Sequence, residues 1–306
     1  MQKNKISGPL ILISAAMIWG LSFVAQNEGM NYIGAFTYNG IRMLIGAAVL
    51  FPVVLYNRIK HKKYKITADI QSYSKSKKLL GITLVGLCLF AGSNLQQFAF
   101  NYTEVGKVGF ITALYMVIVP VLGLFLKKRP PFTVWIGIIL GVVGLYFICI
   151  GSSSSFTIGK GELLTLLCAI AYSVHILVID RFASDIDAVE LSCGQFFITG
   201  VISCILMFIF EEPNIESIRM ALIPILYSGV ISSGVGFTFQ IVGQKRTDPT
   251  ISAMLLCLES VFSVLFAFIL PPHEKLMPIE YTGCAIIFIG IIIAQITPKS
   301  KKLNSD

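Results

Sequence analysis

Ten mostly apolar runs, each of about 20 residues, dominate this sequence and leave few folds open to it. An α-helix of that length spans the hydrocarbon core of a bilayer, which is roughly 30 Å thick. Only 13% of the 306 residues are charged, well below the share usual in soluble domains, so water is not the chain's main solvent. We therefore predict an all-α integral membrane protein. The predicted spans are 8–27, 36–57, 79–100, 104–126, 132–151, 161–180, 189–210, 219–242, 249–271 and 277–297.

The basic residues between these runs predict how the chain is oriented. If the amino terminus is cytoplasmic, 19 of the 24 Lys and Arg residues fall in inner segments and three in outer segments. Cytoplasmic loops of membrane proteins carry such an excess. We therefore predict that both termini, including the tail 298–306, are cytoplasmic and that the membrane is the plasma membrane. The same topology explains the net charge of +8, and no basic patch interleaved with aromatics indicates a nucleic-acid partner.

The two halves of the sequence carry similar landmarks in the same order. Gly8 precedes Trp19 by eleven residues, and Gly161 precedes Tyr172 by the same interval. The fifth and tenth predicted spans each contain two glycines seven residues apart, namely Gly137 with Gly144 and Gly283 with Gly290. Five spans per half is an odd number, so a second half of the same fold would lie inverted in the membrane. Inverted repeats are a recurring architecture of secondary transporters. The predicted repeats are residues 1–151 and 160–297.

Short motifs spread over the whole chain add a family resemblance. They are AMIWGLSFV at 16–24, NGIR at 39–42, QQ at 96–97 with YT at 102–103, GKVGFITALY at 106–115, VP at 119–120, QKRTDP at 244–249 and LESV at 258–261. Together and in this order they resemble the EamA-like family of the drug/metabolite transporter superfamily. Two details depart from the family pattern. Pro120 comes about one helical turn late, and LPPHEK at 270–275 replaces a common Gly-Glu.

The resemblance implies a bundle of ten spans that works by alternating access. It also implies a central cavity lined by spans 1–4 and 6–9, with spans 5 and 10 packed outside. Members of the family move amino acids, other metabolites or drugs, so the resemblance leaves the substrate open.

Polar and aromatic residues within the spans are candidates for lining that cavity. Buried polar groups are costly in lipid and usually face water, a ligand or a hydrogen-bonding partner. The candidate lining residues are Trp19, Asn39, Arg42, Asn94, Gln97, Lys107, Tyr115, Tyr172, His175 and Glu259.

Two interpretations remain for most of these candidates. Arg42 and Asn39 share a helix face, where the guanidinium either holds a substrate anion or reaches the outer headgroups. Asn94 and Gln97 form a polar stripe that either lines the cavity or bonds to neighbouring helices. Lys107 near the outer end of its span either snorkels to the interface or contacts substrate. In the same span, Pro120 should kink the helix near Met116, as a gate or as a static bend.

The remaining candidates are aromatic or titratable. Trp19 and Tyr172 occupy equivalent repeat positions and form either an aromatic wall for a planar or cationic ligand or ordinary packing. His175 either titrates near neutral pH or stays neutral and hydrogen-bonded. Glu259 either exchanges protons during transport or ties its span to a neighbour. The position of Tyr115 in the fourth-span motif makes it a further candidate.

These features favour a secondary transporter that moves an amino acid or similar small metabolite, with export favoured over import. A multidrug or cationic-compound exporter is the alternative, followed by an integral-membrane enzyme or a channel. No nucleotide-binding, zinc or catalytic motif occurs in the sequence, so we expect neither enzymatic activity nor a cofactor. The expected partners are a small-molecule substrate and the lipid bilayer, with protons as a candidate coupling ion.

Overall fold

The computed structural model describes residues 7–64, 75–149, 159–269 and 277–295, and all regular structure within them is helical. Helices are expected in lipid because each backbone polar group must find its partner inside its own segment. The helices are α1 (Ser7–Gly29), α2 (Ala35–Tyr64), α3 (Lys75–Ala99), α4 (Val105–Ala113), α5 (Tyr115–Phe125), α6 (Phe132–Cys149), α7 (Lys160–Phe182), α8 (Ala188–Phe210), α9 (Ile215–Met220), α10 (Leu222–Leu226), the π-helix η1 (Tyr227–Phe237), α11 (Thr238–Gln244), α12 (Pro249–Leu256), α13 (Leu258–Ile269) and α14 (Pro278–Gln295).

Eight helical segments in the described part of the chain are long and apolar enough to cross a membrane. Two shorter apolar segments, Phe132–Ile148 and Pro249–Ser263, correspond to the fifth and ninth predicted spans. The predicted ends of these two spans, and the tail 298–306, lie partly or wholly outside the described residues. An all-helical membrane protein is thus confirmed, whereas the full count of ten spans stays a prediction.

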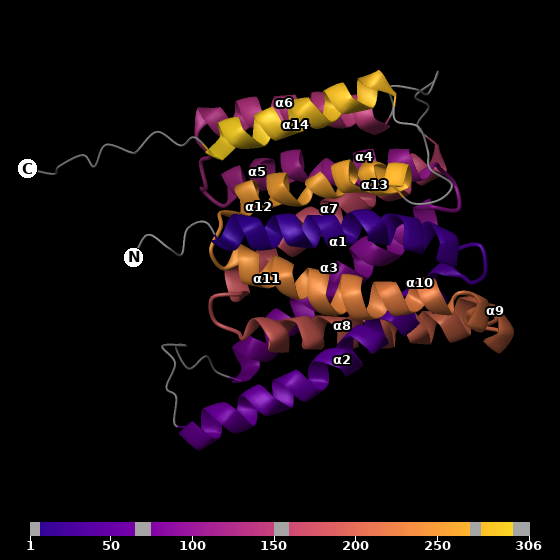
Figure 1. The fold of residues 1–306 in the computed structure, drawn as a ribbon. Coiled ribbons are helices and arrows are strands. Elements are labelled where there is room, and N and C mark those ends of the chain that lie inside the picture. Colours follow the sequence, from indigo (N-terminus) through magenta and orange to yellow (C-terminus); the bar gives the residue numbers. More distant parts are fainter. Residues whose placement is uncertain (1–6, 65–74, 150–158, 270–276, 296–306) are drawn as a thin grey trace, which may run out of the picture.

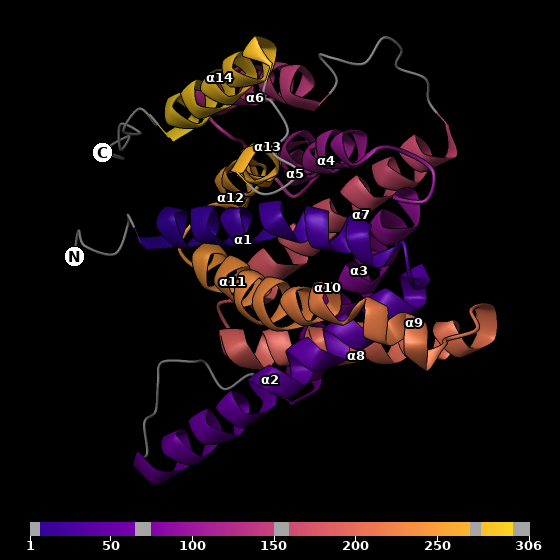
Figure 2. The same ribbon diagram turned by 45° about the vertical axis from the view of Figure 1, so that its right-hand side comes forward.

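The helices pack side by side as a bundle (Figure 1). The pair α6 and α14 forms one edge and the pair α2 and α8 the other, with α1, α3, α7 and the broken segments between them (Figure 2). Arg246 Nη1 donates a hydrogen bond of 2.9 Å to Ser7 Oγ, so the end of α11 and the start of α1 share one end of the bundle. Helix α14 finishes at this same end (Figure 1).

Glycines allow α6 and α14 to approach each other closely. A Cβ atom built on Gly137 would lie 2.5 Å from Gly290 O, and one built on Gly144 would lie 2.6 Å from Gly283 O. Distances this short are impossible for real side chains, so the two backbones touch at the glycines that the sequence spaces seven apart. Small residues of this kind are the usual means of close helix packing in a membrane. Lipid tails are as apolar as the side chains, so the hydrophobic effect does not drive helices together there.

The fourth and ninth predicted spans are each broken once. The first divides into α4 and α5 at Leu114, and the second into α12 and α13 at Cys257. At both breaks the backbone forms a hydrogen bond between residues three apart, as in a 3₁₀-helix. Val117 N donates to Leu114 O at 2.9 Å, and Ser260 N donates to Cys257 O at 3.2 Å. The kink that Pro120 was expected to cause near Met116 corresponds to the break at Leu114, two residues earlier, and Pro120 itself lies inside α5.

The eighth predicted span, 219–242, also differs from a regular helix. It consists of the short helix α10, an 11-residue π-helix and α11. A π-helix is rare, and its wider turn shifts the side chains that follow it relative to those of an α-helix. Six of the eleven residues in YSGVISSGVGF are glycine or serine, so the segment is lightly covered by its own side chains and neighbouring helices can approach it. Gly236, for instance, lies against the ring of Trp19.

Candidate functional site

A cavity of about 490 Å³ lies in the middle of the bundle, where α1, α2, α3, α4, α5, α7, η1, α11, α12 and α13 converge. Helices α6, α8 and α14 contribute none of its lining residues. The lining residues are Trp19, Phe23, Gln26, Arg42, Gln96, Thr112, Tyr115, Tyr172, Ile176, Ser232, Phe237, Gln240, Leu256 and Glu259.

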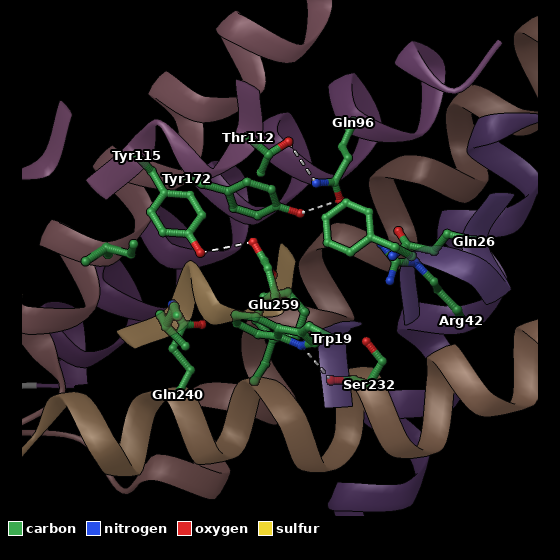
Figure 3. A pocket seen from close by; sticks show the side chains of 14 residues that line it. Trp19, Gln26, Arg42, Gln96, Thr112, Tyr115, Tyr172, Ser232, Gln240 and Glu259 are labelled. Atoms are coloured by element: carbon green, nitrogen blue, oxygen red, sulfur yellow. Dashed lines mark hydrogen bonds between the residues drawn. The ribbon is translucent and has the colours of Figure 1, made fainter. Parts of the chain in front are cut away.

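The two helix breaks meet at this cavity. Tyr115 is the first residue of α5, and Glu259 is the second residue of α13. The Tyr115 hydroxyl donates a hydrogen bond of 3.0 Å to Glu259 Oε1, and Figure 3 shows both side chains turned toward the same space. Within the described chain Glu259 makes no other hydrogen bond or ion pair, and only 5% of the residue is exposed. The phenol of Tyr115 and the carboxyl of Glu259 therefore meet directly after the two helix breaks.

Arg42 is the cavity's cation, and it has no anionic partner among the described residues. Only 2% of the residue is exposed. Its Nε donates a hydrogen bond of 2.6 Å to Asn39 Oδ1, and its guanidinium lies 5.8 Å from the centre of the Tyr38 ring. A buried charge is costly unless it is paired, and here the guanidinium faces the cavity (Figure 3). The site is therefore built to accept an anionic group.

Asn39 and Asn94 stand behind Arg42 instead of lining the cavity. Asn39 Nδ2 donates to Ser93 O at 3.0 Å and to Asn94 Oδ1 at 3.2 Å. Asn94 Nδ2 in turn donates to Ser203 Oγ on α8 at 3.0 Å. This chain of hydrogen bonds ties α2, α3 and α8 together and orients the one oxygen that holds Arg42.

Aromatic rings from opposite halves of the chain wall the cavity. The Trp19 ring lies 4.6 Å from the Phe237 ring, and Trp19 Nε1 donates a hydrogen bond of 3.3 Å to Ser232 O in the π-helix. Across the cavity, Tyr172 contacts Gly92 of α3 and is 3.5 Å from Gln96 Oε1. Trp19 and Tyr172 thus both face the cavity, as the aromatic-wall interpretation requires, and each rests on a glycine of the other half.

Amide groups supply the remaining polar lining. Gln96 Nε2 donates to Thr112 Oγ1 at 3.2 Å. Gln26 Oε1 and Gln240 Oε1 are buried and have no hydrogen-bond partner in the described structure. Buried acceptors without partners are uncommon in proteins, so a bound donor, from water or from a ligand, is expected at each of them.

Three predicted residues lie away from the cavity. Gln97 Nε2 donates to the backbone oxygen of Gln26 at 3.1 Å, so Gln97 supports a lining residue without lining the cavity. His175 is fully buried, and its Nε2 lies 2.9 Å from Gln195 Oε1. Lys107 is half-buried near one end of the bundle and interacts electrostatically with Glu162. The structure therefore agrees better with the alternative given for each residue than with direct contact with a ligand. Gln97 bonds to a neighbouring helix, His175 is hydrogen-bonded within the bundle, and Lys107 lies near the end of its span.

The predicted lining also missed several residues. Gln96 takes the place expected for Asn94 and Gln97 on α3, while Gln26, Thr112, Ser232 and Gln240 add polar groups from other helices. A helical stripe on α3 offers no means to choose between these positions, because Ser93, Asn94, Gln96 and Gln97 are all buried. The π-helix residues had no sequence signal at all.

Comparison with known proteins agrees with this architecture. The model of the EamA-like transporter family matches residues 6–150 and again residues 159–295. The chain belongs to the EamA-like transporter family. Two uncharacterized transporters are similar to it over nearly its whole length: YoaV of Bacillus subtilis is 24% identical and covers 95% of this chain and 98% of its own length, and one from Archaeoglobus fulgidus is 24% identical and covers 96% and 87%. A solved crystal structure shares the fold of this EamA-like chain, with a TM-score of 0.78 and 19% identity over 95% of this chain and 97% of its own.

The family and the names of its relatives point to a multi-pass membrane transporter that is not an enzyme. A protein of that kind binds small-molecule substrates and resides in a lipid bilayer. Within the described residues of this EamA-like protein, no cluster of three His, Cys, Asp or Glu side chains is placed to hold a metal ion.

Proposed function

We propose that this protein is a secondary transporter for a small metabolite that carries an anionic group, such as an amino acid. The observation that carries the proposal is the buried guanidinium of Arg42, which faces the central cavity and has no carboxylate partner among the described residues. A substrate carboxylate would pair with it, and arginine holds carboxylates with two parallel hydrogen bonds. Glu259 on the same cavity would take a substrate ammonium or a proton.

We propose further that two five-helix repeats, 1–151 and 160–297, form an inverted pair. The family model matches twice, at 6–150 and 159–295. Contacts between the halves are reciprocal as well: Trp19 rests on Gly236, and Tyr172 rests on Gly92. Two similar halves around a central site can exchange conformations, so that the site opens to each side of the membrane in turn. This exchange is the basis of alternating access.

In this proposal both termini are cytoplasmic and the membrane is the plasma membrane, with export as the favoured direction. The charge bias of the loops supports the orientation. The helix ends support it too, because α1 begins and α14 finishes at the same end of the bundle (Figure 1).

A multidrug or cationic-compound exporter is the second candidate. Glu259 has no cationic partner among the described residues, and Trp19 and Tyr172 line the same cavity. Aromatic faces beside a carboxyl are a known arrangement for organic cations. An anionic substrate would depend on Arg42, whereas a cationic compound would depend on Glu259.

The deciding experiment is uptake of labelled amino acids, nucleosides and cationic dyes into inverted vesicles, with and without a pH gradient. We expect saturable uptake of an amino acid that an excess of the same unlabelled compound accelerates by counterflow. Unsaturable flux would indicate a channel, and a chemically altered product would indicate an enzyme. Uptake of dyes alone would support the second candidate and overturn the first.

A further inference from the structure

A second large depression lies on the outer side of the bundle and shares no lining residue with the central cavity. It runs between the second half of α2 and the facing parts of α3 and α8, and we call it the α2 groove. Figure 2 shows the reason for it: the carboxyl-terminal part of α2, which contains Pro52, leaves the bundle. The residues that line the groove include Leu44, Phe51, Arg58, Lys78, Glu190 and Phe197.

The α2 groove consists of two overlapping depressions of about 1260 and 1220 Å³. They share Val54, Arg58, Ile82 and Glu190, so they form one continuous surface. This volume is more than twice that of the central cavity. The buried residues Met43, Leu89 and Phe196 belong to an apolar cluster between the two, so the groove is a separate site.

One end of the groove is apolar and the other is charged. Phe51 and Phe197, which line the apolar end, are 55% and 59% exposed. Leu44 and Arg58 are 14 positions apart on α2, which corresponds to about 21 Å along the helix. One leaflet of the hydrocarbon core is roughly 15 Å deep, so the groove fits one acyl chain and the headgroup beyond it.

Three cations and three carboxylates line the charged end, and their contacts differ. Arg58 Nη2 and Lys78 Nζ both contact Glu190, each at 2.5 Å, so two cations share one carboxylate. Lys75 also lines this end. The other two carboxylates there are engaged elsewhere. Asp187 accepts hydrogen bonds from Val189 N and Glu190 N at the start of α8, and Asp185 lies 3.9 Å from Arg181.

We propose that the α2 groove binds an anionic phospholipid of the cytoplasmic leaflet. Its phosphodiester contacts Arg58, Lys75 and Lys78, and an acyl chain follows Phe51 and Leu44 toward the membrane centre. Basic pockets between helices at the cytoplasmic surface are suited to such headgroups. The assignment rests on the proposed membrane orientation but does not depend on any transport activity.

The test measures lipid binding by the purified full-length protein with native mass spectrometry, using phosphatidylglycerol and, in parallel, phosphatidylcholine. We expect one tightly retained phosphatidylglycerol. The double variant Arg58→Gln/Lys78→Gln should weaken it by about 30-fold, because each basic side chain near an anionic lipid contributes roughly fivefold. The matched control Arg129→Gln removes one cation from an exposed position outside the groove and should change nothing.

Two further variants separate binding from general damage to the fold. Glu190→Gln frees both cations from their shared carboxylate and should strengthen phosphatidylglycerol binding, which unfolding cannot do. Ala48→Trp fills the exposed apolar end with all charges intact and should weaken binding, whereas Val53→Trp, on an exposed position outside the groove, should not. Equal retention of the two lipids, or unchanged retention in both the double variant and Ala48→Trp, would overturn the proposal. The lipid-binding result does not depend on whether the protein transports any of the tested substrates.

Discussion

The central cavity and the α2 groove both contain an arginine of the same helix, but the two arginines have opposite surroundings. Arg42 is 2% exposed and has no carboxylate partner in the described chain, whereas the side chain of Arg58 is 64% exposed and contacts Glu190. A buried charge without a partner is destabilising for the free protein, and a binding site is the usual reason to keep one. Burial and the absence of a carboxylate partner among the described residues, more than the presence of a charge, therefore distinguish the candidate site from the α2 groove.

The sharpest way to break this comparison is to neutralise Arg42. In Arg42→Gln, initial rates of amino-acid counterflow in proteoliposomes should fall by at least about 30-fold, because losing one partner of a buried charge pair costs 2–5 kcal/mol. Protein yield and far-UV circular dichroism provide the control for folding. Retained transport of an amino acid in this variant would remove the anion-binding role of Arg42.

Replacing Glu259 addresses the carboxyl on the other helix break. Glu259→Gln has nearly the same shape and still accepts a hydrogen bond from Tyr115, but it cannot release a proton. We expect counterflow to fall by about tenfold, which corresponds to the low end, about 1.5 kcal/mol, for one hydrogen bond to a charged group. Stimulation by a pH gradient should disappear. Full stimulation in this variant, measured in the same vesicles as the native protein, would exclude Glu259 as the proton carrier.

Tyr115→Phe tests the contact that joins the two breaks. The substitution removes one hydroxyl, and with it the 3.0 Å hydrogen bond to Glu259. The apparent affinity for substrate should change by about fivefold, as expected for one hydrogen bond of roughly 1 kcal/mol. Substrate titration of the initial rate measures this change, with Tyr146→Phe on α6 as a control outside the cavity. An identical affinity in both variants would show that the contact does not shape the site.

The smallest effect is expected for Arg58→Gln. An exposed ion pair contributes 0.2–1 kcal/mol, so the free energy of unfolding should fall by less than about 1 kcal/mol. Counterflow in vesicles of neutral lipid should stay within about twofold of the native rate. A loss as large as that of Arg42→Gln would contradict the distinction between the two arginines and give the α2 groove a direct part in transport.

The candidate site was partly predictable. Trp19, Arg42, Tyr115, Tyr172 and Glu259 line the cavity, and each stood out as an aromatic or polar residue in an apolar run. On α3 the same criterion selects Asn94 and Gln97, whereas Gln96 is the α3 residue that lines the cavity. Several polar residues there are buried on different faces, and periodicity does not reveal which face a neighbouring helix covers and which meets the cavity.

The helix breaks show a similar limit. The break at Leu114 lies two residues before Met116, whose carbonyl Pro120 leaves without a helical partner, so the sequence carries a local signal. The break at Cys257 has no such proline, and the π-helix at 227–237 follows no motif. Contacts with other helices stabilise these irregular turns, and such contacts join residues far apart in the chain.

Composition and the order of apolar runs were sufficient to specify a helical membrane protein, because lipid admits few ways to satisfy a backbone. Short motifs along the chain carried the resemblance to the EamA-like family, which the family model confirms. The spaced glycines served in the sequence only as landmarks of the repeat, and the structure shows that they let α6 and α14 approach each other. Packing in three dimensions selected which polar groups face the cavity and which support them from behind. That choice depends on where ten or so helix surfaces meet, and no single segment contains this information.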